Sequence, residues 1–153
     1  MKKLTALVLI LTVVCAILCS CNQEPEAPKA PFEVGADVVV AEADGHSEWA
    51  GKATANVKIV AGDDVLFCGK VTLTSDTLYA YEFFKAAIEE KELSQEGLEV
   101  GFVTSIGSYV NDANTNTYWM WQYNANNPTN FSVNDVHVFE GDYLLYSFDV
   151  VSW

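Results

Sequence analysis

Aromatic residues between positions 118 and 123 are the first candidates for ligand recognition in this chain of 153 residues. Four of the six positions are aromatic, since the segment reads Tyr118-Trp119-Met120-Trp121-Gln122-Tyr123. On a strand, Trp119, Trp121 and Tyr123 share one side, because successive side chains alternate between the two faces. Their rings would offer a flat apolar surface, suited to stacking on a flat ligand or to anchoring a protein partner.

Two interpretations of this aromatic segment stay open from the sequence. In the first, one face of the strand serves the core and the other is an exposed platform, with Asn124 among the polar residues at its rim. In the second, both faces are covered, one by a helix and the other by residues 33–54. The Asn-rich stretch that begins at Asn124 fits either polar contacts to a ligand or ordinary turn chemistry.

Nucleophilic, hydrolytic and metal chemistry find little support in the rest of the chain. His46 and His137 stand apart from any Cys or carboxylate at ligand spacing. The stretch 112–116 begins like a calcium loop, but Thr117 stands where glycine is required and Tyr123 where the bidentate Glu is required. The sequence has no Gly-x-Ser-x-Gly, His-Glu-x-x-His or phosphate-loop motif. We therefore expect a protein that is not an enzyme and holds no metal.

Cys21 carries the most specific predicted chemistry, which is covalent lipidation of its thiol. Met1-Lys2-Lys3 is followed by an apolar run over residues 4–18, typical of a secretory signal and shorter than the roughly 20 residues that span a bilayer. The next residues, Leu18-Cys19-Ser20-Cys21, resemble a bacterial lipobox. We expect cleavage before Cys21 and a lipid anchor on the extracytoplasmic side of the cell membrane. The alternative is an ordinary secretory signal with an incidental Cys.

The mature chain would be more acidic than the whole sequence. The formal net charge is −13, and removal of residues 1–20 takes away two of the eight Lys and none of the acids, which leaves −15. The sequence contains no Arg. This charge argues against nucleic acid as a partner, because neutralising phosphates requires clustered Lys and Arg. Cys68 would be the only free thiol, expected as a small buried residue.

The chain divides into a signal segment (1–20), a tether (21–32), an extension (33–54) and a domain (55–153). Three of the four prolines lie in the tether, which is expected to act as a semi-rigid spacer. In the extension, residues 38–40 are all Val and could form one strand.

A hairpin is predicted at the start of the domain. Val57 and Ile59 alternate with polar neighbours, as in a half-buried strand. After a turn at residues 62–64, the same alternation continues over residues 67–74. Further strands are expected at residues 102–106, 117–123 and 143–151, with a tight turn at 140–142 and short mixed structure at 131–139.

A helix is predicted after this hairpin. Its apolar face, at three- and four-residue spacing, consists of Leu78, Tyr81, Phe84 and Ile88. Ser75, Asp76 or Thr77 is expected to cap it, because their side-chain oxygens accept hydrogen bonds from free first-turn N–H groups. The fold class that follows is α+β, with one main helix packed on a mixed β-sheet.

From residue 55 onward the chain resembles the transcobalamin-like C-terminal domain. This is the small β-grasp-like module that closes over the corrinoid in transcobalamin and intrinsic factor, and related copies occur in bacterial surface lipoproteins. Residues 77–87 match its helix, and Gly101-Phe102-Val103-Thr104-Ser105-Ile106 matches one of its strands. The third match joins Tyr118-Trp119-Met120-Trp121, the turn Phe139-Glu140-Gly141-Asp142 and the closing strand.

The resemblance implies a corrinoid site at Trp119, Met120 and Trp121. In the cobalamin carriers the segment that begins at this Trp lies against the corrinoid, with Gln and Leu after the Trp. A helical barrel domain, which this chain lacks, supplies the other half of the site. Any affinity of this module for cobalamin is therefore expected to be weak unless a partner completes the pocket.

The sequence thus predicts a surface lipoprotein with a non-catalytic ligand-binding module, for cobalamin, another corrinoid or another flat ligand. The predicted ligand-binding residues are Trp119, Met120, Trp121, Tyr123 and Asn124. Its partners would be the membrane, through the lipid, and a surface or transport protein. The alternative is a protein-interaction or adhesion module that uses the aromatic strand or a sheet edge.

Overall fold

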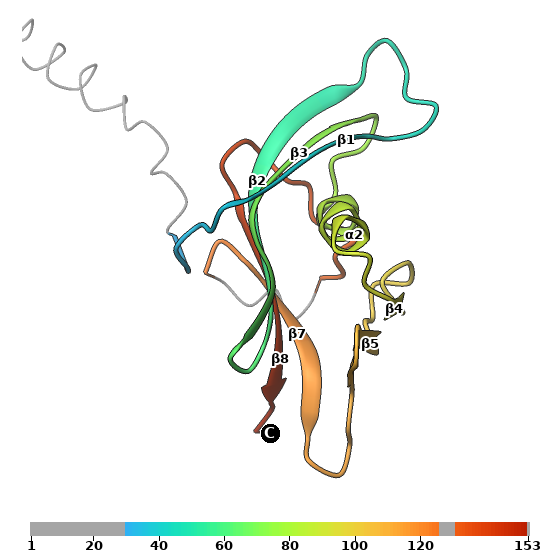
Figure 1. Cartoon of the computed structure of the whole chain (residues 1–153). Coiled ribbons are helices and arrows are strands. Elements are labelled where there is room, and N and C mark those ends of the chain that lie inside the picture. The colour runs from blue at the N-terminus through green and yellow to red at the C-terminus, as the bar shows by residue number, and fades with distance from the viewer. Residues whose placement is uncertain (1–29, 126–130, 153) are drawn as a thin grey trace, which may run out of the picture.

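The computed structural model describes residues 30–125 and 131–152, so Cys21, the predicted signal segment and most of the tether lie outside the described residues. The described part is a small α+β domain in which one helix packs on a five-stranded sheet (Figure 1). The strand order is β1-β3-β2-β8-β7, and a smaller three-stranded sheet has the order β4-β5-β6.

The large sheet is mixed, as predicted. Strand β2 is antiparallel to β3 and β7 is antiparallel to β8, while β1 runs parallel to β3 and β2 runs parallel to β8. The elements in chain order are β1 (Asp37–Glu42), β2 (Gly51–Ala61), β3 (Asp64–Ser75), α2 (Ala80–Glu90), β4 (Gln95–Glu96), β5 (Ser105–Ile106), β6 (Tyr109–Val110), β7 (Thr117–Tyr123) and β8 (Tyr143–Val150).

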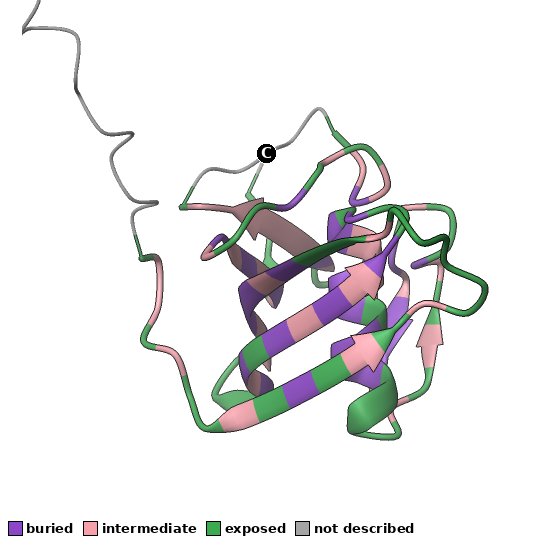
Figure 2. Cartoon of the chain, turned by 90° about the horizontal axis from the view of Figure 1, so that it is seen from above, coloured by how far each residue is buried: buried purple, intermediate pink, exposed green. Residues whose placement is uncertain are grey.

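The predicted hairpin is confirmed as β2 and β3. Val57 and Ile59 on β2 are fully buried, and so are Phe67 and Val71 on β3. Buried and less buried residues alternate along the strands, which shows that one face of the sheet carries the core (Figure 2). Gly62 turns the chain between the two strands with a positive φ of 57°.

The extension contributes a strand that belongs to the same sheet. Val38 and Val40 are exposed on β1, while Val39 between them is buried. Gly69 allows β1 to approach β3, because a Cβ on Gly69 would overlap the main-chain carbonyl of Asp37. The boundary expected at residue 55 falls inside β2, which begins at Gly51. Sequence patterns missed these first residues because Gly and Ala give a weak apolar signal.

The N-terminus of α2 differs from the prediction, because its N-cap is Tyr79. Glu82 reaches back and accepts a hydrogen bond from the Tyr79 N–H at 3.2 Å. The three expected cap residues are held elsewhere. Ser75 and Thr77 donate their hydroxyls to Glu82, and Asp76 accepts from Ser47.

The buried face of α2 is also rotated from the predicted one. It consists of Ala80, Phe83, Phe84, Ala86, Ala87 and Ile88. Of the four predicted positions, Phe84 and Ile88 are on this face, Tyr81 is half-buried and Leu78 precedes the helix. The three alanines are buried, but a helical periodicity that is searched with large apolar residues does not detect them.

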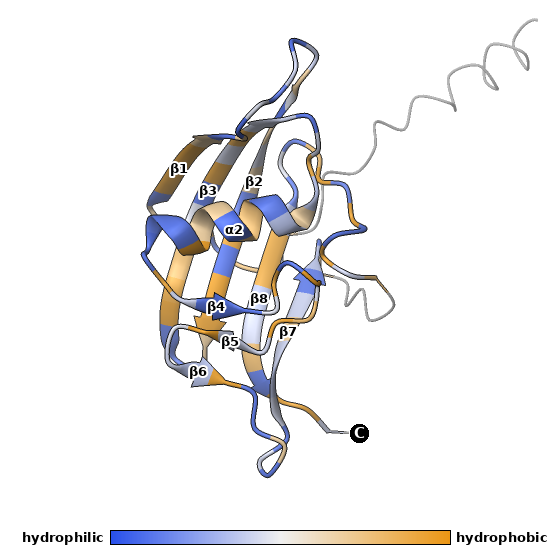
Figure 3. Ribbon diagram, turned by 90° about the vertical axis from the view of Figure 1, so that its right-hand side faces the viewer, coloured by the Kyte–Doolittle hydropathy of each residue, from blue (hydrophilic) through white to orange (hydrophobic). Residues whose placement is uncertain are grey.

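The strand expected at residues 102–106 is wrong for its first half, since β5 contains only Ser105 and Ile106. Gly97 and Gly101 both have positive φ, and the Phe102 N–H donates to the Gly97 carbonyl in a turn. Phe102 is 67% exposed as a result. Figure 3 shows α2 in front of the upper part of the large sheet and the β4-β5-β6 strands in front of its lower part.

Residues 32–35 lie on the face of the sheet opposite α2, which we call the helix-free face. The Phe32 ring meets the ring of Tyr143 edge to face at 5.4 Å, with the Lys58 ammonium 5.9 Å from its centroid. The Gly35 N–H donates to Cys68 Sγ at 3.2 Å. Cys68, expected to be buried in the core, is therefore half-buried on this outer face.

Candidate ligand-binding site

The predicted sharing of one face by Trp119, Trp121 and Tyr123 is confirmed, and that face is the core side of the sheet. In the antiparallel register, these residues lie opposite Phe148, Tyr146 and Leu144. Directly opposite residues of an antiparallel pair point to the same face. Leu144 and Tyr146 are buried, with exposures of 0% and 2%, and Tyr146 packs on Phe84 of α2 at 4.5 Å.

Trp119 is a core residue, so it could meet a ligand only with the small part of its surface that lines a pocket. It is 6% exposed, and its indole N–H donates to the Tyr109 carbonyl at 3.0 Å. Its ring packs on Phe148 at 5.2 Å and on Tyr146 at 6.2 Å. The platform interpretation therefore does not hold at this residue.

An apolar hollow of about 200 Å³ lies beside β7, and we call it the aromatic pocket. Trp121 forms part of it, half-buried, and its indole N–H donates to the Phe131 carbonyl at 3.2 Å. Phe102 and Phe131 stand at its rim with exposures of 67% and 62%. The complete lining is Gly101, Phe102, Val103, Trp119, Met120, Trp121, Phe131 and Tyr146.

Three of the five predicted ligand-binding residues thus meet at this pocket: Trp119, Met120 and Trp121. Phe102 also lines the pocket, although its sequence context predicts a strand residue and gives no sign of binding. Gly101, directly before Phe102, was the one sign in the sequence that a turn and not a strand could stand here. Phe131 gave no signal, because it follows a polar stretch and reaches Trp121 only through the fold.

Tyr123 and Asn124, the other two predicted ligand-binding residues, lie outside the lining of the aromatic pocket and bind Asp142. The Tyr123 hydroxyl donates to Asp142 Oδ2 at 2.6 Å, and the Asn124 side-chain amide donates to Asp142 Oδ1 at 2.8 Å. Asp142 is 3% exposed and also accepts from the Phe139 N–H. Burial, followed by the hydrogen bond to Asp142, raises the pKa of Tyr123 above its usual range.

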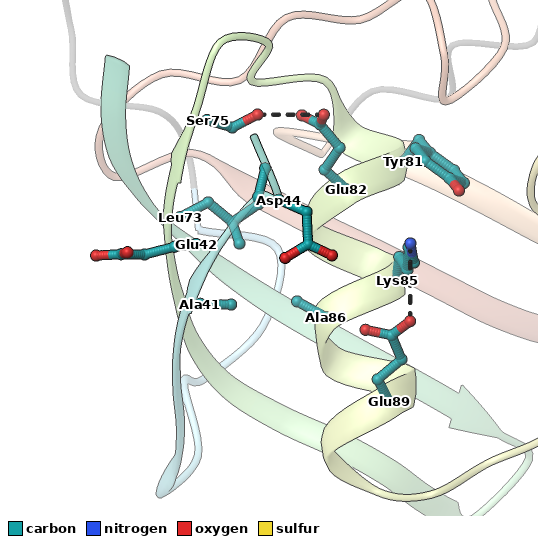
Figure 4. Close-up of a pocket in the computed structure, with 11 residues that line it drawn as sticks. Ala41, Glu42, Asp44, Leu73, Ser75, Tyr81, Glu82, Lys85, Ala86 and Glu89 are labelled. Atoms are coloured by element: carbon teal, nitrogen blue, oxygen red, sulfur yellow. Dashed lines mark hydrogen bonds and ion pairs between the residues drawn. The ribbon is translucent and has the colours of Figure 1, made fainter. Parts of the chain in front are cut away.

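A second, larger hollow of about 430 Å³ lies between β1 and α2, and we call it the acidic groove (Figure 4). Its carboxylates are Glu42, Asp44, Glu82 and Glu89. Glu82 is engaged by Ser75 and caps α2, and Glu89 pairs with Lys85 at 3.8 Å. This polar lining does not suit a flat apolar ligand, so the aromatic pocket is the better candidate site.

The loop that began like a calcium site is closed by its own hydrogen bonds. Asp112 accepts from the main-chain and side-chain N–H groups of Asn114 and from the Thr115 hydroxyl. These hydrogen bonds lower the pKa of Asp112, and the bond from the Asn114 main chain has the largest effect. Within residues 30–125 and 131–152, no three His, Cys, Asp or Glu side chains gather in a way that could hold a metal ion.

Each of the two His residues has a partner among the described residues. His46 Nδ1 lies 2.9 Å from the Ala43 carbonyl. The His137 ring lies between Tyr79 and Phe139, at 6.0 Å and 5.0 Å. No helix among the described residues has the length and apolar character needed to cross a bilayer.

Comparison with known proteins gives no family. No protein-family model matches the chain, and no curated protein matches it. One similar solved structure comes from Ruminococcus gnavus and is described as a "putative metal binding protein". It is 19% identical, with a TM-score of 0.48 over 65% of this chain and 99% of that one. The function must therefore be inferred from the residues of this chain.

Proposed function

We propose that this chain is an exported lipoprotein, anchored through Cys21, whose domain is a non-catalytic module that binds a flat, largely apolar ligand. The aromatic pocket carries this proposal. Its lining combines the face of Trp121 with the exposed rings of Phe102 and Phe131, and such surfaces bind flat ligands well. A corrinoid is the first candidate for the ligand.

Two features support a transcobalamin-like, β-grasp-like relationship. The β2–β3 hairpin is followed by α2, and the closing strand β8 returns parallel to β2 in the middle of the sheet. The Trp119–Trp121 segment that the resemblance places against a corrinoid forms part of the aromatic pocket.

The size of the pocket supports a site shared with a partner. At about 200 Å³, it is smaller than the 300–1,000 Å³ that usually encloses a drug-sized ligand. A corrin ring could place only one edge or substituent in it. Affinity of the chain alone should therefore be weak, and a partner protein would cover the rest of the ligand.

The position of residues 32–35 supports access to the pocket from outside. Phe32 and Gly35 are held on the helix-free face, whereas Trp121 points to the face that α2 covers. A lipid anchor at Cys21 would thus connect to the side of the sheet away from the pocket. The net charge of −15 would also keep the domain off anionic envelope surfaces.

A titration with cobinamide and cobalamin tests the proposal. The mature chain, with Cys21→Ser to avoid lipid, should shift the corrinoid absorbance and quench Trp fluorescence at high micromolar ligand. Trp121→Ala should weaken binding at least about tenfold, which corresponds to loss of one stacking aromatic. Trp49→Ala is the matched control, because Trp49 is 85% exposed on the loop between β1 and β2, away from the pocket lining.

The absence of any spectral change at millimolar corrinoid would exclude this ligand for the chain alone. Equal losses in Trp121→Ala and Trp49→Ala would place the binding outside the aromatic pocket.

A protein-interaction module is the second candidate function. The exposed rings of Phe102 and Phe131 favour it, because contiguous apolar side chains on a surface commonly mark protein contacts. Strand β7 lies at the edge of the sheet next to them.

A further inference from the structure

The outer edge of β7 has main-chain groups that no strand uses. Because β7 is the last strand of the sheet, only one side of its backbone pairs with β8. The Trp119 N–H points away from β8 and donates to Asn111 Oδ1 at 2.9 Å, and Thr117 likewise bonds with Asp112 in place of β8. Main-chain groups alternate along an antiparallel strand, so the N–H and C=O of Trp121 also point outward.

These outward groups of Trp121 have no hydrogen-bond partner in the part of the chain that the structure describes. The residues 111–112 that satisfy the start of β7 do not extend along the strand to this position. An unpaired N–H and C=O on an edge strand form a template on which another strand can pair.

The aromatic pocket lies beside this free edge. Trp121 contributes its side chain to the pocket and its main chain to the edge, and the exposed Phe102 belongs to the same lining. Strand addition uses this combination, in which main-chain hydrogen bonds give affinity and a pocket for an alternate side chain gives specificity.

The charge of this half of the domain indicates the kind of partner. All six Lys of the mature chain lie at or before Lys91, and residues 92–152 contain eight carboxylates and no Lys or Arg. A second copy of this chain would bring the same acidic surface against itself, which disfavours pairing of β7 with β7. A basic segment would be attracted to it.

We propose that the edge of β7 at Trp121 binds an extended segment of a basic partner protein as an added strand, with one apolar side chain in the aromatic pocket. This inference rests on the second candidate function.

The opposite edge of the sheet, β1, lacks the features that carry this inference. The groove beside β1 is lined by carboxylates and offers no apolar pocket for a side chain. Val38 and Val40 are exposed there, but they alternate with the core residue Val39 and so point to the helix-free face. Strand β1 therefore serves as an internal control.

The probe is a synthetic peptide, Lys-Val-Thr-Phe-Thr-Val-Lys, acetylated and amidated at its ends. Titration into the isotope-labelled mature chain with Cys21→Ser should shift the Trp121 amide signal and slow its hydrogen exchange, while β1 amides stay unchanged. Replacing both Lys with Glu should weaken binding about fivefold at low salt, with a smaller difference at high salt.

Backbone methylation separates strand addition from simple apolar binding. In an extended peptide, the Thr N–H groups point to one side and the Val N–H groups to the other. One peptide is methylated on both Thr nitrogens and the other on both Val nitrogens. The affinity of one of them should fall at least about tenfold, and that of the other should stay within about twofold of the parent peptide. An equal effect of the two methylations overturns the proposal.

Two variants of equal exposure locate the site. Phe102→Ala should weaken binding of the peptide, whereas Val38→Ala on β1 should leave the affinity unchanged. The two variants are matched because both side chains are 67% exposed. Shifts confined to β1, or no binding of the parent peptide at millimolar concentration, overturn the proposal. A chain that binds the peptide and no corrinoid excludes only the first candidate function, and one that binds corrinoid but treats both methylated peptides alike excludes only strand addition.

Discussion

The Tyr123 hydroxyl and the buried Asp142 carboxylate, 2.6 Å apart, join the end of β7 to the turn before β8. The two strands are consecutive in the sheet but are separated by residues 124–142 in the chain. Asp142 also accepts from Asn124 and Phe139, so one carboxylate fixes the ends of a long connection. Asp142 therefore holds the end of β7 and the turn before β8 together.

Asp142→Ala should lower the free energy of unfolding by about 2–4 kcal/mol, because it leaves three partly buried donors without their acceptor. Tyr123→Phe removes one hydroxyl and should cost only about 1 kcal/mol. Asp149→Ala is the control, since Asp149 is exposed at the end of β8. Urea denaturation monitored by Trp fluorescence gives the three values. Equal effects of Asp142→Ala and Asp149→Ala would contradict the role given to Asp142.

Stability should fall at alkaline pH through two tyrosines. Burial raises the pKa of Tyr146, and burial together with Asp142 raises the pKa of Tyr123, both from an ordinary value of 10.0. The folded state thus favours the neutral phenols, and their contribution is complete below pH 10 and decreases as pH rises above it. Absorbance of tyrosinate should show a delayed fraction that ionises with unfolding. Tyr123→Phe should make this fraction smaller and flatten the loss of stability.

Gly69→Ala should destabilise the domain by about 1–3 kcal/mol, the usual cost of overpacking. The added Cβ would overlap the Asp37 carbonyl and push β1 away from β3. Hydrogen exchange should therefore accelerate on β1 before it does on β2. Lys70→Ala, one residue further and exposed, should leave exchange on β1 unchanged.

The two tryptophans of β7 should respond differently to truncation. Trp119→Ala should cost about 3–5 kcal/mol, as for other buried aromatics, because it removes a side chain that is 6% exposed. Trp121→Ala should cost clearly less and leave the circular dichroism spectrum unchanged. If Trp121→Ala unfolds the domain instead, Trp121 is a core residue and the aromatic pocket is not a binding site.

Cys21→Ser should release the protein from the membrane fraction. The thiol of Cys21 is the atom expected to carry the lipid, and a serine hydroxyl cannot replace it. Fractionation of cells and mass spectrometry of the mature N-terminus measure the change. Cys19→Ser is the control, because Cys19 would leave with the signal segment. Continued membrane association of Cys21→Ser, with an unlipidated N-terminus in the unsubstituted protein, would contradict anchoring.

The local periodicities predicted the parts of the fold that depend on neighbours in sequence. Alternation at Val57, Ile59 and Phe67 identified the hairpin, and alternation at Trp119 and Trp121 identified a shared face. These signals succeed because a strand repeats every two residues regardless of its partners.

The parts that were missed depend on contacts between distant segments. The cap of α2 is Tyr79 because Ser75 and Thr77 bind the same Glu82. Phe131 joins the pocket through a hydrogen bond to Trp121 that no local pattern could indicate. Asn124 was expected at a polar rim, and its side chain donates a hydrogen bond to Asp142, 18 positions away in the chain. Tertiary contacts of this kind override local propensity.

The docking of Phe32 and Gly35 ahead of β1 also has a mechanical consequence. Residues 32–35 directly precede β1, whereas the proposed docking edge is β7 at the other side of the order β1-β3-β2-β8-β7. Once the contact between Phe32 and Tyr143 of β8 has broken, a pulling force between a lipid at Cys21 and a bound partner would cross all five strands. The contacts of Phe32 and Cys68 would bear the force first. Strand β1, which pairs only with β3, would be the first strand to separate from the sheet.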